Sequence, residues 1–168
     1  MKTIILMRHA KAVRDQEAPN DRARGLTGRG RRDAAAAGAA LIAAGVKPEF
    51  ALVSSAQRTR ETAHYALAEI APIDVRVDDD LYLADPQTIW QAAMAAPAGR
   101  VLVIAHNPGI HEIAAMLADQ AGDRSNAARA AAASFPTSAF AAFEIENDIL
   151  TASGARFLAG WRPEKSED

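Results

Sequence analysis

The chain has 168 residues, which is the size of a single compact domain. Hydrophobic residues make up 49% of it and charged residues 24%, so it has enough apolar side chains for a full core. A net charge of −2 provides no global attraction to nucleic acid or to an anionic membrane, and the absence of cysteine excludes disulfide scaffolds, thiol catalysis and cysteine-ligated zinc.

The N-terminus shows no sign of a targeting segment. The first apolar run, residues 4–7, is shorter than the apolar region of a signal peptide, and no small-residue cleavage site follows it. Elsewhere no apolar run approaches the ~20 residues that a membrane-spanning helix needs. We therefore expect a protein without a membrane segment that acts in the cytoplasm.

The first half of the chain alternates apolar runs with helical stretches. Residues 3–8 form a continuous apolar run with β-branched side chains, which is typical of a strand covered on both faces. After a polar loop at 10–25, Thr27 can cap a helix that runs to Ala44 and stops at Gly45. The same criteria predict a strand at 50–54, a helix at 56–70 capped by Ser55, and a weaker strand at 74–77.

The second half contains one strong buried strand and several weaker signals. Residues 101–105 form that strand, which ends at His106. Asn107 suits the N-cap and Pro108 the first position of a helix that runs to about residue 118. The other predicted elements are a helix at 87–95, a helix-favouring alanine-rich stretch at 129–133, and an antiparallel pair of strands at 139–145 and 149–158.

Strands that alternate with helices predict an α/β fold with three layers, α/β/α, and a mostly parallel central sheet that is extended by the late antiparallel pair. We expect residues 1–162 to form one domain and residues 163–168 a polar C-terminal tail. In parallel sheets, ligands bind beyond the carboxyl ends of the strands. The three strong strands end at Arg8-His9, Ser54-Ser55 and His106-Asn107, so these residues are expected to meet at one edge of the sheet.

The residues at this predicted edge suit a phosphoryl group. His9 and His106 close two of the strands, and Arg8 lies beside the first histidine. Arg58 falls in the first turn of a predicted helix, where the N-terminal N–H groups also favour an anion. Arginine matches phosphate oxygens with paired hydrogen bonds. One such residue alone is usually structural, but two histidines and two arginines together at strand ends predict a phosphate site.

These motifs, in this order, resemble the histidine phosphatase superfamily, also called phosphoglycerate mutase-like. Residues 7–10 (MRHA) resemble its Arg-His-Gly signature, with Ala10 in place of the glycine. The resemblance implies a metal-independent phosphatase that needs no cofactor and in which His9 attacks phosphorus and forms a phosphohistidine intermediate. It also implies that Arg8, Arg58 and His106 stabilise the phosphoryl oxygens. The other matching segments are Leu26-Thr27 with Gly30, residues 54–62 (SSAQRTRET) and residues 104–109 (IAHNPG).

Within the superfamily, the chain is similar to the short SixA-type phosphohistidine phosphatases. It has no insertion long enough for a substrate lid, and Arg24 stands just before Leu-Thr as in that branch. Leu83 occupies the place where larger members carry the glutamate that protonates the leaving group. Because the N–P bond of phosphohistidine is weaker than a phosphate ester bond, a site without this acid favours nitrogen-bound phosphate. Asp85 is the candidate for a replacement acid, ahead of Asp80.

The expected substrate is a phosphate-bearing group, with phosphohistidine in a signalling protein as the favoured form. Arg24 and Asn107 are expected to be further phosphate or substrate contacts. One alternative is a phosphatase of small phosphate esters or phosphoramidates, and another is a non-catalytic module that binds phosphate or a phosphoprotein. A zinc site at the two histidines is disfavoured because the adjacent arginines repel a cation. The sequence does not indicate an oligomeric state.

Overall fold

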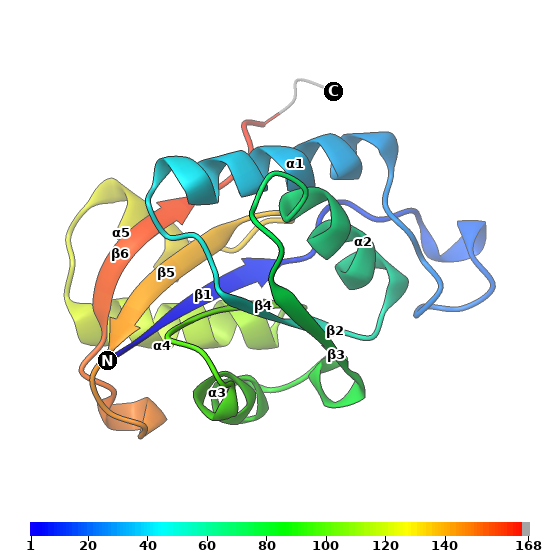
Figure 1. The fold of residues 1–168 in the computed structure, drawn as a ribbon. Helices are drawn as coiled ribbons and strands as arrows, with labels where there is room; N and C mark the ends of the chain where they lie inside the picture. Colours follow the sequence, from blue (N-terminus) through cyan, green and yellow to red (C-terminus); the bar gives the residue numbers. More distant parts are fainter. Residues whose placement is uncertain (166–168) are drawn as a thin grey trace.

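A central six-stranded sheet organises residues 1–165, the part of the chain that the computed structural model describes. The strands are β1 (Lys2–Arg8), β2 (Phe50–Ser54), β3 (Asp74–Asp78), β4 (Arg100–Ala105), β5 (Phe140–Ile145) and β6 (Arg156–Trp161). The α-helices are α1 (Gly28–Ala43), α2 (Gln57–Ala66), α3 (Pro86–Ala95), α4 (Gly109–Ala121) and α5 (Asn126–Ala133). Figure 1 shows α1 and α2 on one side of the sheet and α3 and α4 on the other.

The strands follow the order β3-β2-β4-β1-β5-β6. The first four are parallel to one another, whereas β5 runs antiparallel to β1 and β6 antiparallel to β5. This confirms the predicted three-layer α/β/α fold, with its mostly parallel sheet and late antiparallel pair. Because β2, β4 and β1 are adjacent and parallel, their carboxyl ends lie side by side at one edge of the sheet.

The two faces of the sheet bury alternate side chains of the same strands. In β1, Ile4 and Leu6 belong to the core under α3 and α4, whereas Ile5 and Met7 belong to the core under α1 and α2. Each strand residue in these sets has an exposed fraction near zero, which explains why the strand reads as a continuous apolar run rather than an alternating one. The helices α1 and α2 meet the second core through small residues, including Ala37.

Several predicted element ends are confirmed, and others are corrected. Thr27 caps α1, because its side chain accepts a hydrogen bond from the Gly30 N–H over 3.0 Å. Ser55 does not cap α2, whose N-cap is Ala56, and the helix ends at Ala66 rather than at residue 70. Three further corrections concern helix starts and the last strand: α3 begins one residue earlier than predicted, α4 begins at Gly109 after Pro108 as its N-cap, and the last strand is Arg156–Trp161 instead of 149–158.

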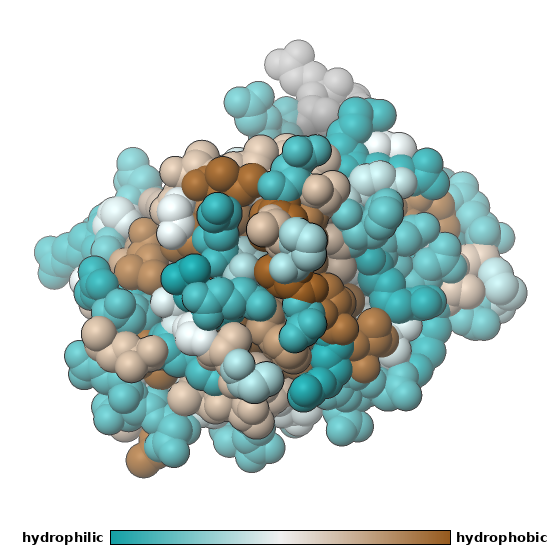
Figure 2. Space-filling view, viewed as in Figure 1, coloured by the Kyte–Doolittle hydropathy of each residue, from teal (hydrophilic) through white to brown (hydrophobic). Residues whose placement is uncertain are grey.

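The surface near the sheet edge at β3 is partly apolar. Val75 and Val77 of this edge strand are 48% and 50% exposed. In Figure 2, most of the visible face is hydrophilic, and hydrophobic residues gather near its middle. Within the described residues, every helix is too short or too polar to cross a bilayer. Of the predicted polar tail, residues 163–165 form no helix or strand, and residues 166–168 lie outside the described residues.

Candidate active site

The residues predicted at the strand ends meet in one cleft. The cleft has a volume of about 310 Å³ and lies beyond the carboxyl ends of β1, β2 and β4. Both predicted histidines, all three predicted arginines and the predicted asparagine line it, together with an aspartate and a leucine. The lining residues are Arg8, His9, Asp21, Arg24, Arg58, Leu83, His106 and Asn107.

His9 is held as a neutral ring with one nitrogen open for attack. Its side chain is only 8% exposed, and its Nδ1 lies 2.7 Å from the carbonyl oxygen of Ala10. A carbonyl can only accept, so Nδ1 carries the proton and Nε2 has the free lone pair. The pKa of His9 is lowered to about 3, chiefly by burial; the Ala10 carbonyl opposes this shift, and the charges of Arg8 and Arg58 add to it.

Alanine fits where the resembling family usually has glycine. Ala10 is fully buried and packs with Leu26 and Ala34. Its N–H donates to the Thr62 hydroxyl on α2 over 2.9 Å. Ala10 is not among the described residues with positive φ, so its backbone does not need glycine. The loop after β1 is therefore tied directly to the helix that carries Arg58.

His106 faces His9 across the floor of the cleft, with 5.4 Å between the two ring centres. Its Nε2 lies 2.7 Å from the Ser54 hydroxyl, and Nη2 of Arg58 donates to its Nδ1 over 3.3 Å. The Tyr82 ring packs edge-on against it at 5.5 Å. Burial lowers the pKa of His106 to about 4, and the charge of Arg58 acts in the same direction.

Each arginine of the cleft floor is anchored at its tip. Nη1 of Arg8 donates to the Phe135 carbonyl oxygen over 3.2 Å, and Nη1 of Arg58 donates to the Asp21 carbonyl oxygen over 2.8 Å. The Nε atoms of both arginines are buried and have no hydrogen-bond partner within the described structure. A buried, unpaired charged donor is costly, so these two N–H groups are suited to the oxygens of a phosphoryl group.

Asn107 and Arg24 lie at the sides of the same cleft. Asn107 shares the Phe135 carbonyl with Arg8, through Nδ2 at 2.9 Å, and its peptide bond to Pro108 is cis. Arg24 donates to the Val13 carbonyl from Nε and to an Asp21 oxygen from Nη1, at 2.8 and 3.0 Å. The structure thus brings both residues to the place where sequence reasoning expected them.

Sequence reasoning missed Asp21 and Tyr82. The Asp21 carboxylate accepts hydrogen bonds from Arg24, Arg58 and the Tyr82 hydroxyl. These bonds, that from Tyr82 above all, hold its pKa well below the usual range of a carboxyl. Burial, together with this carboxylate, raises the pKa of Tyr82. The only signal in the sequence was an acid three residues before Arg24, which is too common to single out.

Leu83, at the position of the glutamate of the larger proteins, lies in the cleft, whereas the two candidate replacement acids lie outside it. Leu83 lies in the cleft lining, is 56% exposed and has a positive φ of 53°. Asp85 is the N-cap of α3, where its carboxylate accepts from the Thr88 N–H over 2.7 Å. That hydrogen bond lowers its pKa, and neither Asp85 nor the exposed Asp80 lines the cleft. The structure does not bring the expected replacement acid to the site.

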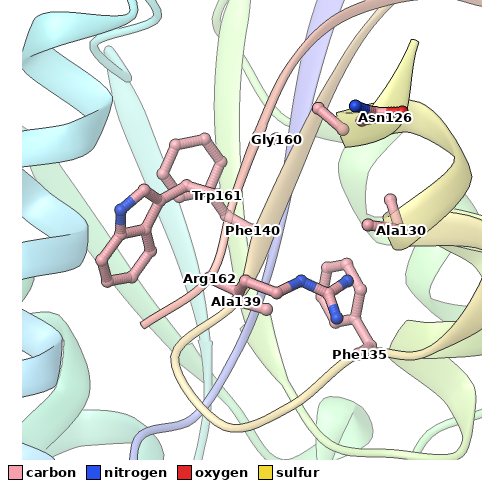
Figure 3. A pocket seen from close by; sticks show the side chains of 10 residues that line it. Asn126, Ala130, Phe135, Ala139, Phe140, Gly160, Trp161 and Arg162 are labelled. Carbon is pink, nitrogen blue, oxygen red and sulfur yellow. The ribbon is translucent and has the colours of Figure 1, made fainter. Parts of the chain in front are cut away.

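A second hollow, of about 300 Å³, lies between α5 and β6. Figure 3 shows its mostly apolar lining, in which Phe135 lies beside the Arg162 side chain and Trp161 lies on the opposite side. None of the predicted catalytic residues lines it. Its link to the active-site cleft is Phe135, whose side chain lines the hollow and whose carbonyl oxygen binds Arg8.

Known proteins with the same fold and sequence pattern place this site in a family. The family model described as histidine phosphatase superfamily (branch 1) matches residues 4–82. An uncharacterized protein of Mycobacterium leprae is 35% identical over 144 residues, which covers 83% of this chain and 87% of that protein.

Two solved structures are similar along almost the whole chain. A proposed phosphohistidine phosphatase SixA from Nakamurella multipartitia is 30% identical, with a TM-score of 0.82 and 96% of each chain covered. A proposed SixA from Agrobacterium tumefaciens is 26% identical, with a TM-score of 0.78, and the match covers 96% of this chain and 98% of that one.

The chain therefore belongs to the histidine phosphatase superfamily, and within it to the SixA-type branch. It is accordingly a hydrolytic phosphatase, in a superfamily whose nucleophile is a histidine. The arrangement of the cleft is chemically consistent with that assignment, because it combines a neutral imidazole with cationic hydrogen-bond donors.

Proposed function

We propose that this phosphatase removes the phosphoryl group from phosphohistidine in proteins and that His9 is its nucleophile. The observation that carries the proposal is the state of the His9 ring: it is neutral, its Nδ1 proton is bound to the Ala10 carbonyl, and it faces a cleft lined by three arginines. A neutral imidazole attacks phosphorus, whereas a protonated one has no lone pair to do so.

In the proposed reaction, Nε2 of His9 attacks phosphorus in line while the bond from phosphorus to the leaving nitrogen breaks. The buried Nε–H groups of Arg8 and Arg58 hold the equatorial oxygens, which is the main contribution a protein makes to phosphoryl transfer. His106, Arg24 and Asn107 complete the contacts to the phosphate. Water then attacks the phosphohistidine intermediate and releases inorganic phosphate.

The lining of the cleft supports phosphoramidates over phosphate esters as substrates. Its only carboxyl group within residues 1–165 is that of Asp21, whose lowered pKa keeps it ionised at neutral pH. No protonated carboxylic acid is therefore available to an alkoxide leaving group, which needs a proton to depart. Leu83 stands at the mouth instead. The similarity to proteins described as phosphohistidine phosphatases supports the same substrate class.

A histidine-phosphorylated signalling protein in the cytoplasm is the substrate that this proposal includes. The cleft is open at the side of the exposed Leu83, so a phosphorylated side chain on a protein surface can enter it. A small phosphate ester is less suited, because the described lining offers no proton donor for its leaving oxygen. A module that only binds phosphate gains nothing from the neutral, oriented His9.

The direct test compares His9→Ala with His64→Ala. His64 is exposed on α2 and lies outside the cleft, which makes it a matched control. We expect His9→Ala to lose hydrolysis of a phosphohistidine peptide by at least about 10³-fold, and to lose the phosphoenzyme that a ³²P-labelled phosphoramidate leaves on the wild type. Near-wild-type turnover by His9→Ala would contradict the proposal, as would a wild type that does not hydrolyse the peptide.

A further inference from the structure

The Asp21 carboxylate is a negative charge inside a site that binds a dianion, and phosphate binding alone does not explain it. We propose that Asp21 is a specificity-determining residue that accepts a hydrogen bond from the leaving group, namely from the distal ring N–H of a protonated phosphoimidazole. This inference rests on the proposed function and names the form of the substrate that the site selects.

The position of Asp21 fits a contact with the leaving group. Its side chain is 41% exposed, whereas His9 is 8% exposed, and both line the same cleft. The nucleophile thus lies at the floor and the carboxylate nearer the mouth. In-line displacement puts the leaving group opposite the nucleophile, so the leaving group lies on the side of the mouth.

The carboxylate keeps capacity for one more donor. Its Oδ1 accepts from Arg24 over 3.0 Å, and its Oδ2 accepts from Arg58 over 3.1 Å and from the Tyr82 hydroxyl. A carboxylate offers about four lone-pair positions, and three are used here. These partners fix its orientation and stabilise its ionised form, so it can accept a hydrogen bond and has no proton to give.

The negative charge of Asp21 also favours a cationic leaving group beside it. Arg8, Arg24 and Arg58 supply three positive charges, and the lowered pKa values of the two histidines keep both rings neutral. A carboxylate in this set weakens the attraction for a phosphoryl dianion. It strengthens the attraction for a substrate that carries its own positive charge next to phosphorus, which is the distinguishing property of a protonated phosphoimidazole.

The transfer then needs no acid. The Nε2–P bond forms on His9 as the bond from phosphorus to the leaving nitrogen breaks, and the electron pair of that bond stays with the leaving nitrogen. The leaving ring departs neutral, with its distal N–H still bound to Asp21. The positive charge moves to His9, whose Nδ1–H is bound to the Ala10 carbonyl. Each ring thus has one acceptor for its distal N–H, and the bond made and the bond broken are of the same kind.

An ester does not gain from this arrangement. Its oxygen develops negative charge as it departs, and an ionised Asp21 repels that charge. Asp21 also orients Arg58 and Arg24, and that effect acts on both substrate classes alike. The ratio of the two activities therefore separates the proposed contact from a purely positioning role.

The test measures kcat/KM for a phosphohistidine peptide and for p-nitrophenyl phosphate in the wild type and in Asp21→Asn. Both activities should fall because Arg58 loses an anionic partner, but the peptide activity should fall by about 10- to 100-fold more. Asp21→Glu keeps the negative charge and should restore most of the ratio. Tyr82→Phe removes a partner of the carboxylate but not the charge, and it should keep the wild-type ratio.

An unchanged ratio in Asp21→Asn would overturn the inference and leave Asp21 as a residue that only positions arginines. A ratio that stays low in Asp21→Glu, in a protein that circular dichroism shows to be folded, would also contradict the inference. Neither outcome would contradict the proposed function. That function fails in a different way, when the wild type does not hydrolyse the peptide at all.

Discussion

Arg58 and Ser54 hold the two nitrogens of the His106 ring, and Arg58 determines which of them carries the proton. Nη2 of Arg58 points a donor at Nδ1 of His106 over 3.3 Å, so Nδ1 must present its lone pair. In a neutral ring the proton is then on Nε2, which lies 2.7 Å from the fully buried Ser54 hydroxyl. We assign this tautomer from the hydrogen-bond network. A hydroxyl at the end of β2 thus orients the ring that faces the nucleophile.

We predict that Ser54→Ala lowers kcat by about tenfold or more, because it leaves a buried N–H without a partner at a cost of about 1–3 kcal/mol. The Nε2 ¹⁵N shift of His106 should also change, because this N–H loses its hydrogen-bond acceptor. Ser55→Ala is the matched control, since Ser55 is the adjacent serine and bonds to the exposed Arg22 and Asp79 instead of to His106. Wild-type kcat and an unchanged Nε2 shift in Ser54→Ala would show that the hydroxyl has no such role.

At the scale of elements, α1 and α2 pack closely because Gly38 has no side chain. A Cβ built at Gly38 would lie 2.0 Å from the Ala66 carbonyl oxygen, which belongs to the last residue of α2. The clash is with backbone, so α2 as a whole would have to move. The same helix carries Arg58 near its start and, through Thr62, holds the Ala10 N–H. Its position therefore matters for the cleft as well as for the core.

Gly38→Ala should lower the free energy of unfolding by about 2–4 kcal/mol, as overpacking against backbone does, and should lower kcat through Arg58. Gly28→Ala in the same helix is the control, because its added Cβ would be 3.6 Å from the flexible Arg32 side chain. It should be neutral or stabilising by at most about 1 kcal/mol. Urea unfolding measures both, and equal stabilities of the two variants would contradict the packing argument.

The sequence predicted correctly those helices and strands that are marked by apolar runs or by capping residues. The buried strand before His9 is a continuous apolar run, and Thr27 is an N-cap with its partner three residues away. The last strand was misplaced because Ile149 and Leu150 are apolar without being in a strand, and Leu150 is buried in a 3-10 turn. Gly154, with a positive φ of 63°, then separates this turn from the strand.

The residues of the candidate site were predictable only where they lie at the end of a predicted strand or the start of a predicted helix. Residues that end a strand or begin a helix were found, because a parallel sheet brings such ends together. Asp21 was not, since its contacts with Arg58 and Tyr82 join positions 37 and 61 residues apart. Contacts between residues so far apart in the sequence, at least one of them in a loop, leave no periodic pattern, and only a three-dimensional structure shows them.

For the whole molecule, the two histidines of the cleft lower the free energy of unfolding as the pH falls. Their folded-state pKa values are about 3 for His9 and about 4 for His106, below the ~6.5 of an unfolded histidine. As pH falls below 6.5, the unfolded chain takes up two protons that the native state refuses. The stability that the neutral rings provide is thus complete above that pH and is lost as pH approaches their folded-state pKa values.

Between pH 7 and pH 5, the free energy of unfolding should fall by about 2 kcal/mol for each of these histidines. Thermal or urea unfolding across this range measures the loss. His9→Gln and His106→Gln should each flatten the dependence by about half, because each removes one of the two titrating groups. His64→Ala should keep the wild-type slope, since its side chain is exposed; an equally steep slope in all variants would refute this account.

The carbonyl oxygen of Phe135 makes the active-site cleft depend on a late segment of the chain. Every side chain of the cleft comes from residues 8–107, yet Arg8 and Asn107 are both anchored on this one oxygen from the segment between α5 and β5. In addition, β1 is flanked by β5 as well as by β4. The first 121 residues contain every side chain that lines the cleft, but they lack the carbonyl oxygen that anchors two of those side chains. The segment after α4 is therefore needed for the catalytic geometry although it contributes no side chain to the cleft.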